Sequence, residues 1–144
     1  MAVVGGGAAI LIAYGANHEK KETEGAIAKY QLTKFEAGFM KQCKSSMRSH
    51  KVKFAKGAAR TEGCACTTSK ISKSLSQKLI KPAGDVLDVA FYLGENKRKN
   101  KTKLYAIGTR KFEAVKKKHR LSKKQFKTVI STVFSSLKQC GKPV

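Results

Sequence analysis

Residues 121–140, LSKKQFKTVISTVFSSLKQC, decide the fold class of this chain. Ser122 followed by Gln125 forms the capping-box pattern that begins a helix, and the preceding Leu121 can pack back onto the first turn. Apolar residues then recur every three or four positions, which places them on one helix face with Lys, Ser and Thr opposite. The predicted apolar face contains Phe126, Val129, Ile130, Val133, Phe134, Leu137 and Cys140. Gly141 and Pro143 then end the helix.

The same pattern predicts a helix earlier in the chain. Thr33 and Glu36 form a second capping box, and the apolar residues that follow again have helical spacing. They are Phe35, Phe39, Met40, Cys43 and Met47. The opposite side carries Lys34, Lys41, Lys44 and Arg48. We therefore expect a buried apolar stripe beneath a solvated basic face.

The middle of the chain has weaker signals. Residues 49–63 are basic and rich in small residues, so we expect a long loop anchored by Val52 and Phe54. A helix should begin between Thr61 and Ala65 and run to Ile80, where Lys81-Pro82 stops the apolar repeat.

Residues 85–93 form an apolar run that periodicity alone cannot assign. We favour a short buried helix opened by Asp85. The alternative is a short β-hairpin near residues 89–107, in which residues 104–107 pair back across a basic loop. Thr109 would then cap a further helix ending in the basic run 116–120. The fold class is therefore all-α, a small antiparallel bundle of four or five helices in one basic domain over residues 18–144.

Residues 1–17 form a separate apolar segment. Residues 2–16 carry no charge and are rich in Ala, Val, Ile and Gly, as in the apolar region of a signal peptide or a membrane anchor. As a helix they would extend about 22 Å, short of a bilayer core of about 30 Å. No basic residue precedes the run, which leaves a buried segment of a cytosolic domain as an alternative. Glycines 5–7 would suit a dinucleotide-binding turn, but Ile10 stands where that pattern needs Gly or Ala.

Four cysteines, Cys43, Cys64, Cys66 and Cys140, favour a disulfide framework in an exported protein. A bridge between Cys64 and Cys66 would be strained, so Cys43 should pair with one of these two and Cys140 with the other. The second bridge would close a long loop and suit a thin core. Free buried thiols remain one alternative. A zinc site is the other, although the three histidines are scattered.

The charge of the chain points to an anionic partner. Thirty-one basic and nine acidic residues give a net charge of +22, which attracts nucleic acid, anionic lipid, polysaccharide or an acidic protein face. Lysine outnumbers arginine, 26 to 5, so base-specific readout is not expected, since that favours the arginine fork. Charge density in the loops predicts contacts through Lys51, Lys53, Lys56, Arg60, Lys97, Arg98, Lys99, Lys101, Lys103, Lys116, Lys117 and Lys118.

The sequence offers no catalytic constellation. No nucleophile with a base, no carboxylate pair and no metal-ligand spacing is recognisable, so we expect neither enzyme activity nor a cofactor or metal. The favoured hypothesis is a periplasmic, secreted or membrane-anchored structural or accessory subunit of a cell-envelope assembly. A lysine-rich, cytoplasmic nucleic-acid-binding protein of ribosomal or nucleoid type is the alternative. A membrane-active effector is a third reading.

Overall fold

The computed structural model describes residues 18–54, 59–98 and 100–141, and within them the fold is all-helical. A first helix covers residues 18–30. It is followed by α2 (Lys34–Ser49), α3 (Arg60–Ser74), α4 (Gln77–Glu95), α5 (Lys101–Lys118) and α6 (Lys123–Gln139). The helical bundle is confirmed, although the expected count of four or five helices was too low. The apolar segment 1–17 lies outside the described residues.

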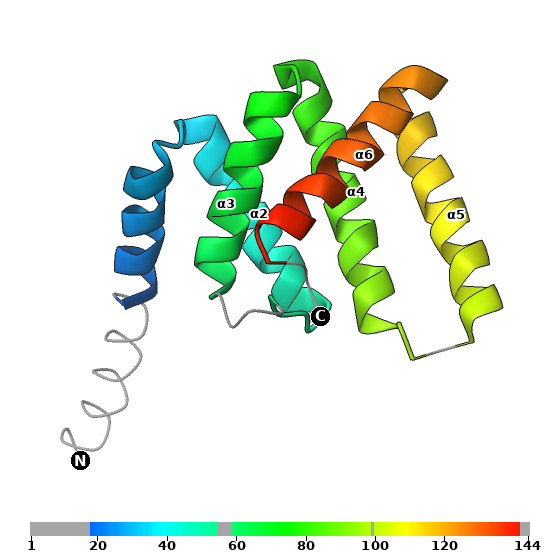
Figure 1. Ribbon diagram of the computed structural model, residues 1–144, viewed down its shortest axis with the longest axis horizontal. Coiled ribbons are helices and arrows are strands. Elements are labelled where there is room, and N and C mark those ends of the chain that lie inside the picture. The colour runs from blue at the N-terminus through cyan, green and yellow to red at the C-terminus, as the bar shows by residue number, and fades with distance from the viewer. Residues whose placement is uncertain (1–17, 55–58, 99, 142–144) are drawn as a thin grey trace, which may run out of the picture.

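Helix α3 occupies the centre of the bundle. It packs against α2, α4 and α6, and Figure 1 shows α6 crossing α3 and α4 on one side of the molecule. Because α3 has neighbours on several sides, small and weakly polar residues fill much of its surface. Those buried include Gly63, Cys64, Ala65, Thr67, Thr68 and Ser69. A helix buried on several sides has no marked apolar stripe, which is why its sequence gave a weak signal.

The predicted helix from residue 61 to Ile80 was wrong at its end. The chain breaks at Leu75, which is extended (φ −115°, ψ 146°), and α4 begins after Ser76. Pro82 is not a stop but a buried residue inside α4. At the sixth helical position a proline removes one early hydrogen bond, and burial of Ile80, Ala83 and Val86 around it offsets that loss.

The hairpin near residues 89–107 is not observed, and no strand occurs in the described part of the chain. The apolar run 85–93 belongs to α4, which starts eight residues before Asp85. Helix α5 begins at Lys101, capped by the Asn100 side chain, and not at Thr109. The Thr109 hydroxyl instead donates to the Tyr105 carbonyl within the helix at 2.9 Å. The favoured helical assignment of residues 85–93 is therefore confirmed, although its start at Asp85 was wrong, and the hairpin alternative is not observed.

The connection between α2 and α3 is shorter than the predicted loop over 49–63. Helix α3 begins at Arg60, whose guanidinium donates to the Val52 carbonyl at 3.0 Å. The N-cap, Ala59, has no side-chain hydrogen bond, so the sequence carried no start signal. Val52 and Phe54 are buried at 1% and 3% exposure, which confirms both as the anchors of this connection.

Three helices end in the same way. Gln31, Lys51 and Arg120 follow the helix over 18–30, α2 and α5, and each has a positive φ between 51° and 54°. The residue after each donates back to a carbonyl five positions earlier: Leu32 to Ile27, Val52 to Met47 and Leu121 to Lys116. This is the Schellman arrangement, in which an apolar residue after the left-handed position packs under the helix end. After Leu32 and Leu121 the next residue, Thr33 or Ser122, is already the N-cap of the following helix, whereas α3 begins eight residues after Val52.

Both predicted capping boxes are confirmed, at Thr33 with Glu36 and at Ser122 with Gln125. Along α6 the buried residues include Val129, Val133 and Leu137, as the periodicity predicted. Phe134 departs from that prediction, since 42% of it is exposed. Its ring meets Phe112 of α5 edge-on, with ring centroids 6.3 Å apart. None of the helices within residues 18–54, 59–98 and 100–141 combines the length and apolar content needed to cross a bilayer.

Candidate functional site

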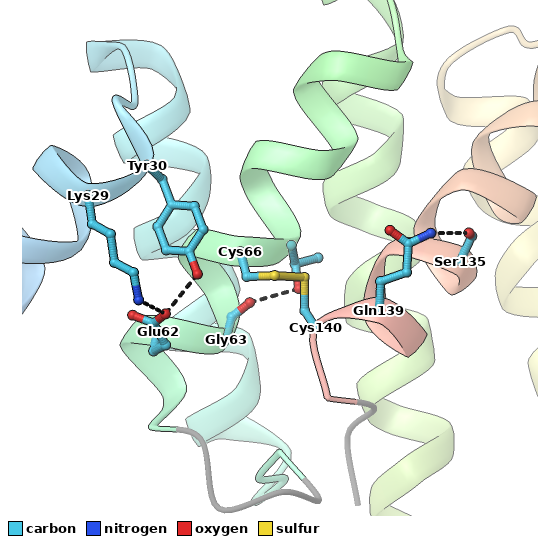
Figure 2. Close-up of a disulfide and its surroundings, with 9 residues drawn as sticks. Lys29, Tyr30, Glu62, Gly63, Cys66, Ser135, Gln139 and Cys140 are labelled. Carbon is cyan, nitrogen blue, oxygen red and sulfur yellow. Dashed lines mark hydrogen bonds and ion pairs between the residues drawn. A yellow bond between two sulfur atoms is a disulfide. The ribbon is translucent and has the colours of Figure 1, made fainter.

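Two disulfides hold the core helices together. Cys43 of α2 bonds to Cys64 of α3, and Cys66 of α3 bonds to Cys140 at the end of α6. Figure 2 shows the second bridge between α3 and the C-terminal end of α6. All four thiols are therefore used, and neither free thiols nor cysteine ligands for zinc remain. Disulfides of this kind persist in oxidising, non-cytoplasmic compartments.

A third contact supports the same region. The Glu62 carboxylate at the start of α3 accepts hydrogen bonds from the Lys29 ammonium and the Tyr30 hydroxyl, both at 2.7 Å (Figure 2). The hydrogen bond from Lys29 is the main reason that the pKa of Glu62 is lowered. Burial, followed by the same carboxylate, raises the pKa of Tyr30. The helix over 18–30 is thus fastened to α3 beside the disulfides.

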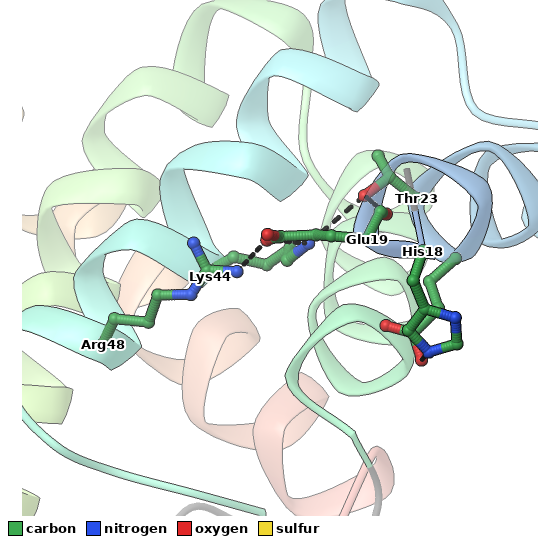
Figure 3. Close-up of polar contacts among 6 residues, drawn as sticks. His18, Glu19, Thr23, Lys44 and Arg48 are labelled. Atoms are coloured by element: carbon green, nitrogen blue, oxygen red, sulfur yellow. Dashed lines mark hydrogen bonds and ion pairs between the residues drawn. The ribbon is translucent and has the colours of Figure 1, made fainter. Parts of the chain in front are cut away.

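A buried cation fastens the same helix to α2. The Glu19 carboxylate lies between the Lys44 ammonium, at 3.3 Å, and the Arg48 guanidinium (Figure 3). Lys44 also donates to the Thr23 hydroxyl at 3.2 Å, and only 4% of Lys44 is exposed. The hydrogen bonds from Arg48 and then Lys44 lower the pKa of Glu19. Lys44, which the sequence assigned to a solvated face, is therefore a paired structural residue.

Two histidines join α4 to the ends of α2 and α5. His50, the C-cap of α2, contacts Glu95 through Nδ1 at 2.9 Å and Asp88 through Nε2 at 3.1 Å. His119, the C-cap of α5, contacts Asp85 through Nε2 at 2.6 Å. The two helix ends are therefore held to α4 by equivalent polar contacts. A histidine at a helix C-terminus also suits the helix dipole.

The chemistry of the His50 cluster is limited by its connectivity. The Ser46 hydroxyl donates to Asp88 at 2.5 Å and not to His50. A serine nucleophile requires the hydroxyl to bond to the histidine, with the carboxylate behind that histidine. The order observed here is serine, aspartate, histidine, so the cluster is suited to joining helices. Within the described residues, no group of three His, Cys, Asp or Glu residues is placed to hold a metal.

The unbalanced charge is concentrated at the C-terminal end of the sequence. From residue 96 onward there are 16 Lys and Arg residues and a single acidic residue, Glu113. Residues 1–95 contain 15 basic and eight acidic residues. The acidic side chains of the N-terminal part include the partners of the contacts above, whereas α5 and α6 have almost none. These two helices therefore carry most of the uncompensated positive charge.

Helix α5 displays a regular row of cations. Lys103, Arg110 and Lys117 are exposed and follow one another at intervals of seven residues. Seven residues are about two helical turns, or about 10 Å, so the three lie on one face. Only Gly108 and Val115 of this helix are fully buried. We call Lys103, Arg110 and Lys117 the α5 cation row.

The predicted contact residues do not all belong to one surface. Lys51 and Lys53 are exposed beyond α2, while Arg60 is partly buried and bound to Val52. Lys97, Arg98, Lys101 and Lys103 are exposed near the turn between α4 and α5. Lys117 is exposed on α5, whereas Lys116 is partly buried and Lys118 is paired with Asp85 at 3.2 Å. Lys56 and Lys99 lie outside the described residues.

Sequence reasoning missed three members of this region, Tyr105, Arg110 and Lys111. Tyr105 is 79% exposed, and the Lys111 ammonium lies 4.4 Å from the centre of the Tyr92 ring on α4. The hairpin alternative assigned residues 104–107 to a strand. In a strand, Tyr105, Arg110 and Lys111 would not have been expected on one helix. The seven-residue spacing of Lys103, Arg110 and Lys117 was the signal that could have identified the cation row.

Between α4 and α5 lies an open, largely apolar groove of about 340 Å³. Its apolar wall is formed by Leu93, Leu104, Tyr105, Gly108 and Phe112, with Lys101 at its edge. The groove and the α5 cation row lie on nearly opposite sides of α5, since Lys103 is about 200° around the helix from the lining residue Lys101. They are two separate candidate surfaces. Comparisons of the chain with protein-family models, curated proteins and solved structures found no match.

Proposed function

We propose that this chain is a non-enzymatic helical protein of an oxidising compartment outside the cytoplasm, and that it acts as a structural or accessory subunit of a cell-envelope assembly. Its working surface is the face of α5 that carries the cation row, and its partners are anionic. The observation that carries the proposal is the charge distribution: 16 basic residues and one acidic residue from position 96 onward.

The packing of α5 supports this role. Exposed cations are often balanced by nearby carboxylates, as Lys29 and Arg48 are here. Lys103, Arg110 and Lys117 project from a helix whose only acidic residue is Glu113. A row of like charges repels itself, and an anionic partner relieves that repulsion while increasing the association rate.

The disulfides support the compartment. Two bridges in a chain of 144 residues match the usage of exported domains, which rely on covalent links where the core is small. Anchoring through the apolar segment 1–17, or cleavage after it, belongs to the same proposal. An intact mass of the protein from its native source, with and without reduction, tests this part. Four alkylatable thiols without reduction would contradict export.

The binding role is tested by charge reversal. Lys103, Arg110 and Lys117 are changed together to Glu, and binding to poly-L-glutamate, phosphatidylglycerol vesicles and duplex DNA is measured over a range of salt concentrations. The matched control changes three exposed lysines of the other helices, Lys34, Lys41 and Lys78, to Glu. Both variants lose the same net charge, so only a localised site distinguishes them.

We expect the α5 variant to lose binding to the acidic polymer or vesicles by about tenfold more than the control. Equal losses in both variants would show that total charge alone governs binding and would contradict the proposed surface. Tight binding confined to DNA, with a steep salt dependence, would favour the nucleic-acid alternative.

A further inference from the structure

The α4–α5 groove has a specific structural origin. Gly108 of α5 faces the Leu93 side chain of α4, and a Cβ built on it would lie 3.1 Å from Cδ2 of Leu93. The absence of a side chain at Gly108 therefore lets Leu93 lie against the α5 backbone and form the floor of the groove. Helix α6 packs against α3 and α4, and Figure 1 shows that the N-terminal half of α5 extends well away from it. The groove lies along that half.

Tyr105 forms an exposed wall of this groove. Its exposure of 79% is far greater than that of Phe35 or Phe134, the other exposed large apolar residues in the described part of the chain. A tyrosine offers a rigid apolar ring with a polar end, which is why it is enriched at the centres of protein interfaces. The described residues cover only a small part of the Tyr105 ring, so most of it is open to a partner.

The edge of the groove is positively charged. Lys101 lines it directly, and Lys97 and Arg98 are exposed in the turn that precedes α5. Glu95, two residues after the lining residue Leu93, is paired with His50 at 2.9 Å, and Glu113 is one helical turn beyond the lining residue Thr109. An occupant of the groove must therefore present apolar groups to its floor and negative charges to its edge.

The shape of the groove selects among such occupants. It is concave, and its α5 wall runs from Lys101 to Phe112, which is about 16 Å or three helical turns. A volume of about 340 Å³ accommodates a few side chains. A flat bilayer surface contacts protruding side chains, whereas side chains spaced along a helix enter a concave groove as a row.

We propose that the α4–α5 groove binds an acidic amphipathic helix of a partner protein. Apolar side chains at three- and four-residue spacing fill the groove beside Tyr105, and carboxylates on the flanks of the same helix meet the cations at the edge. This inference rests on the proposed function only for the anionic character of the partner, since the groove and the cation row lie on nearly opposite sides of α5 and the groove is a second contact surface.

The experiment uses the full disulfide-bonded chain and a fluorescent synthetic peptide with Leu at helical spacing and Glu on its other faces. A second peptide has the same composition in an order without an apolar face. The variant is Tyr105→Glu, and the matched control is Ala106→Glu at the exposed neighbouring position. Successive helix positions differ by about 100°, so the control adds the same charge to a different face of α5.

We expect the amphipathic peptide to bind at least about tenfold more tightly than the reordered peptide, and Tyr105→Glu to weaken it about tenfold, as a central aromatic anchor would. Ala106→Glu should change the affinity by less than about threefold, because Ala106 does not line the groove. The readout is fluorescence anisotropy of the labelled peptide.

Other outcomes separate this inference from the proposed function. Equal binding of both peptides, or equal effects of the two variants, would overturn the groove but leave anionic binding by α5 intact. Phosphatidylglycerol vesicles that bind in a Tyr105-dependent manner, while neither peptide binds, would overturn the helix proposal in favour of lipid. Binding of no anionic probe at all would overturn both.

Discussion

Cys64 and Cys66 lie two residues apart on α3 and bond in opposite directions, Cys64 to Cys43 of α2 and Cys66 to Cys140 beyond α6. Two residues correspond to about 200° around a helix, so their side chains leave α3 on nearly opposite faces. The Cys-x-Cys spacing therefore makes α3 a link between two helices that do not share a bridge. The two disulfides join cysteines 21 and 74 residues apart in the sequence, and the two closed loops do not overlap.

The pairing can be tested with two-cysteine variants. Replacing Cys43 and Cys64 by Ala leaves Cys66 and Cys140, whose Cα atoms are 5.7 Å apart, and one disulfide should form. Replacing Cys43 and Cys66 leaves Cys64 and Cys140 on different sides of α3, and both thiols should stay reactive. Alkylation in denaturant before reduction, followed by intact mass, counts the free thiols, including that of the buried Cys64. A bridge between Cys64 and Cys140 in the folded variant would contradict the observed pairing.

Loss of the long bridge should reduce stability substantially. In the chain-entropy model, the 74-residue loop closed by Cys66–Cys140 limits the unfolded ensemble by about 4 kcal/mol. The Cys66→Ala, Cys140→Ala variant should lose about this amount of unfolding free energy, measured by urea denaturation. An unchanged midpoint would show that α6 is held by packing alone.

Thr68 offers a stabilising substitution. It is 1% exposed, and its hydroxyl is the one buried side-chain oxygen or nitrogen in the described residues without a hydrogen-bond partner. Thr68→Val keeps the shape and removes an unsatisfied polar group, so the unfolding free energy should rise by about 1 kcal/mol.

The neighbouring Thr67 is the matched control for that change. It is equally buried, but its hydroxyl donates to the Gly63 carbonyl at 2.8 Å. Thr67→Val removes that hydrogen bond and should stabilise less or destabilise. Equal effects of the two changes in urea unfolding would mean that the hydroxyl of Thr68 has a partner in solution.

Arg120 gives a prediction about backbone strain. With φ at 51° it occupies the left-handed region, which costs a non-glycine residue about 1 kcal/mol. Arg120→Gly should therefore raise the unfolding free energy by about 0.5 kcal/mol, after the greater freedom of glycine in the unfolded chain is included. Lys117→Gly, within the last turn of α5, should lower it by about 1 kcal/mol. Thermal unfolding of both variants checks the opposite signs.

The contacts of the Asp85 carboxylate predict that the protein loses stability in acid. Burial raises the pKa of this carboxyl, but hydrogen bonds from His119 and Lys118 outweigh burial, and the pKa lies below its ordinary value of 3.8. A lowered pKa in the folded state means that the contact stabilises fully above the unfolded pKa and is lost as pH falls through the folded one. The pKa values of Glu19, Glu36 and Glu62 are lowered too. Unfolding free energy should therefore fall below about pH 4.

The Asp85→Asn variant isolates the contribution of Asp85. It should be less stable than the wild type at neutral pH, and the difference should shrink as pH falls from about 4 to about 2, where the wild-type carboxyl also becomes neutral. Glu113→Gln, an exposed change on α5, is the control. A difference between wild type and Asp85→Asn that stays constant over this range would contradict the assigned contact.

The sequence by itself determined the parts of the fold that depend on local interactions. Helices α2 and α6 were identified from the capping boxes at Thr33 and Ser122 and from the apolar stripes that follow them. A helix start and an amphipathic face each depend on residues only one or two turns apart, so the sequence alone is enough to predict them. The basic composition and the even cysteine count likewise need no coordinates. They predicted the sign of a partner's charge and the presence of two bridges.

The tertiary structure decided what depends on neighbours distant in sequence. Central helix α3 has small residues on several faces, so its packing, and the choice of Cys43 for Cys64, followed only from where α2 and α6 lie. Pro82 was tolerated inside α4 because buried neighbours offset a lost hydrogen bond. Packing also decided that Tyr105 is exposed beside Gly108. It likewise decided which lysines have an acidic partner, because the order of charges along the sequence does not show which side chains meet in the fold.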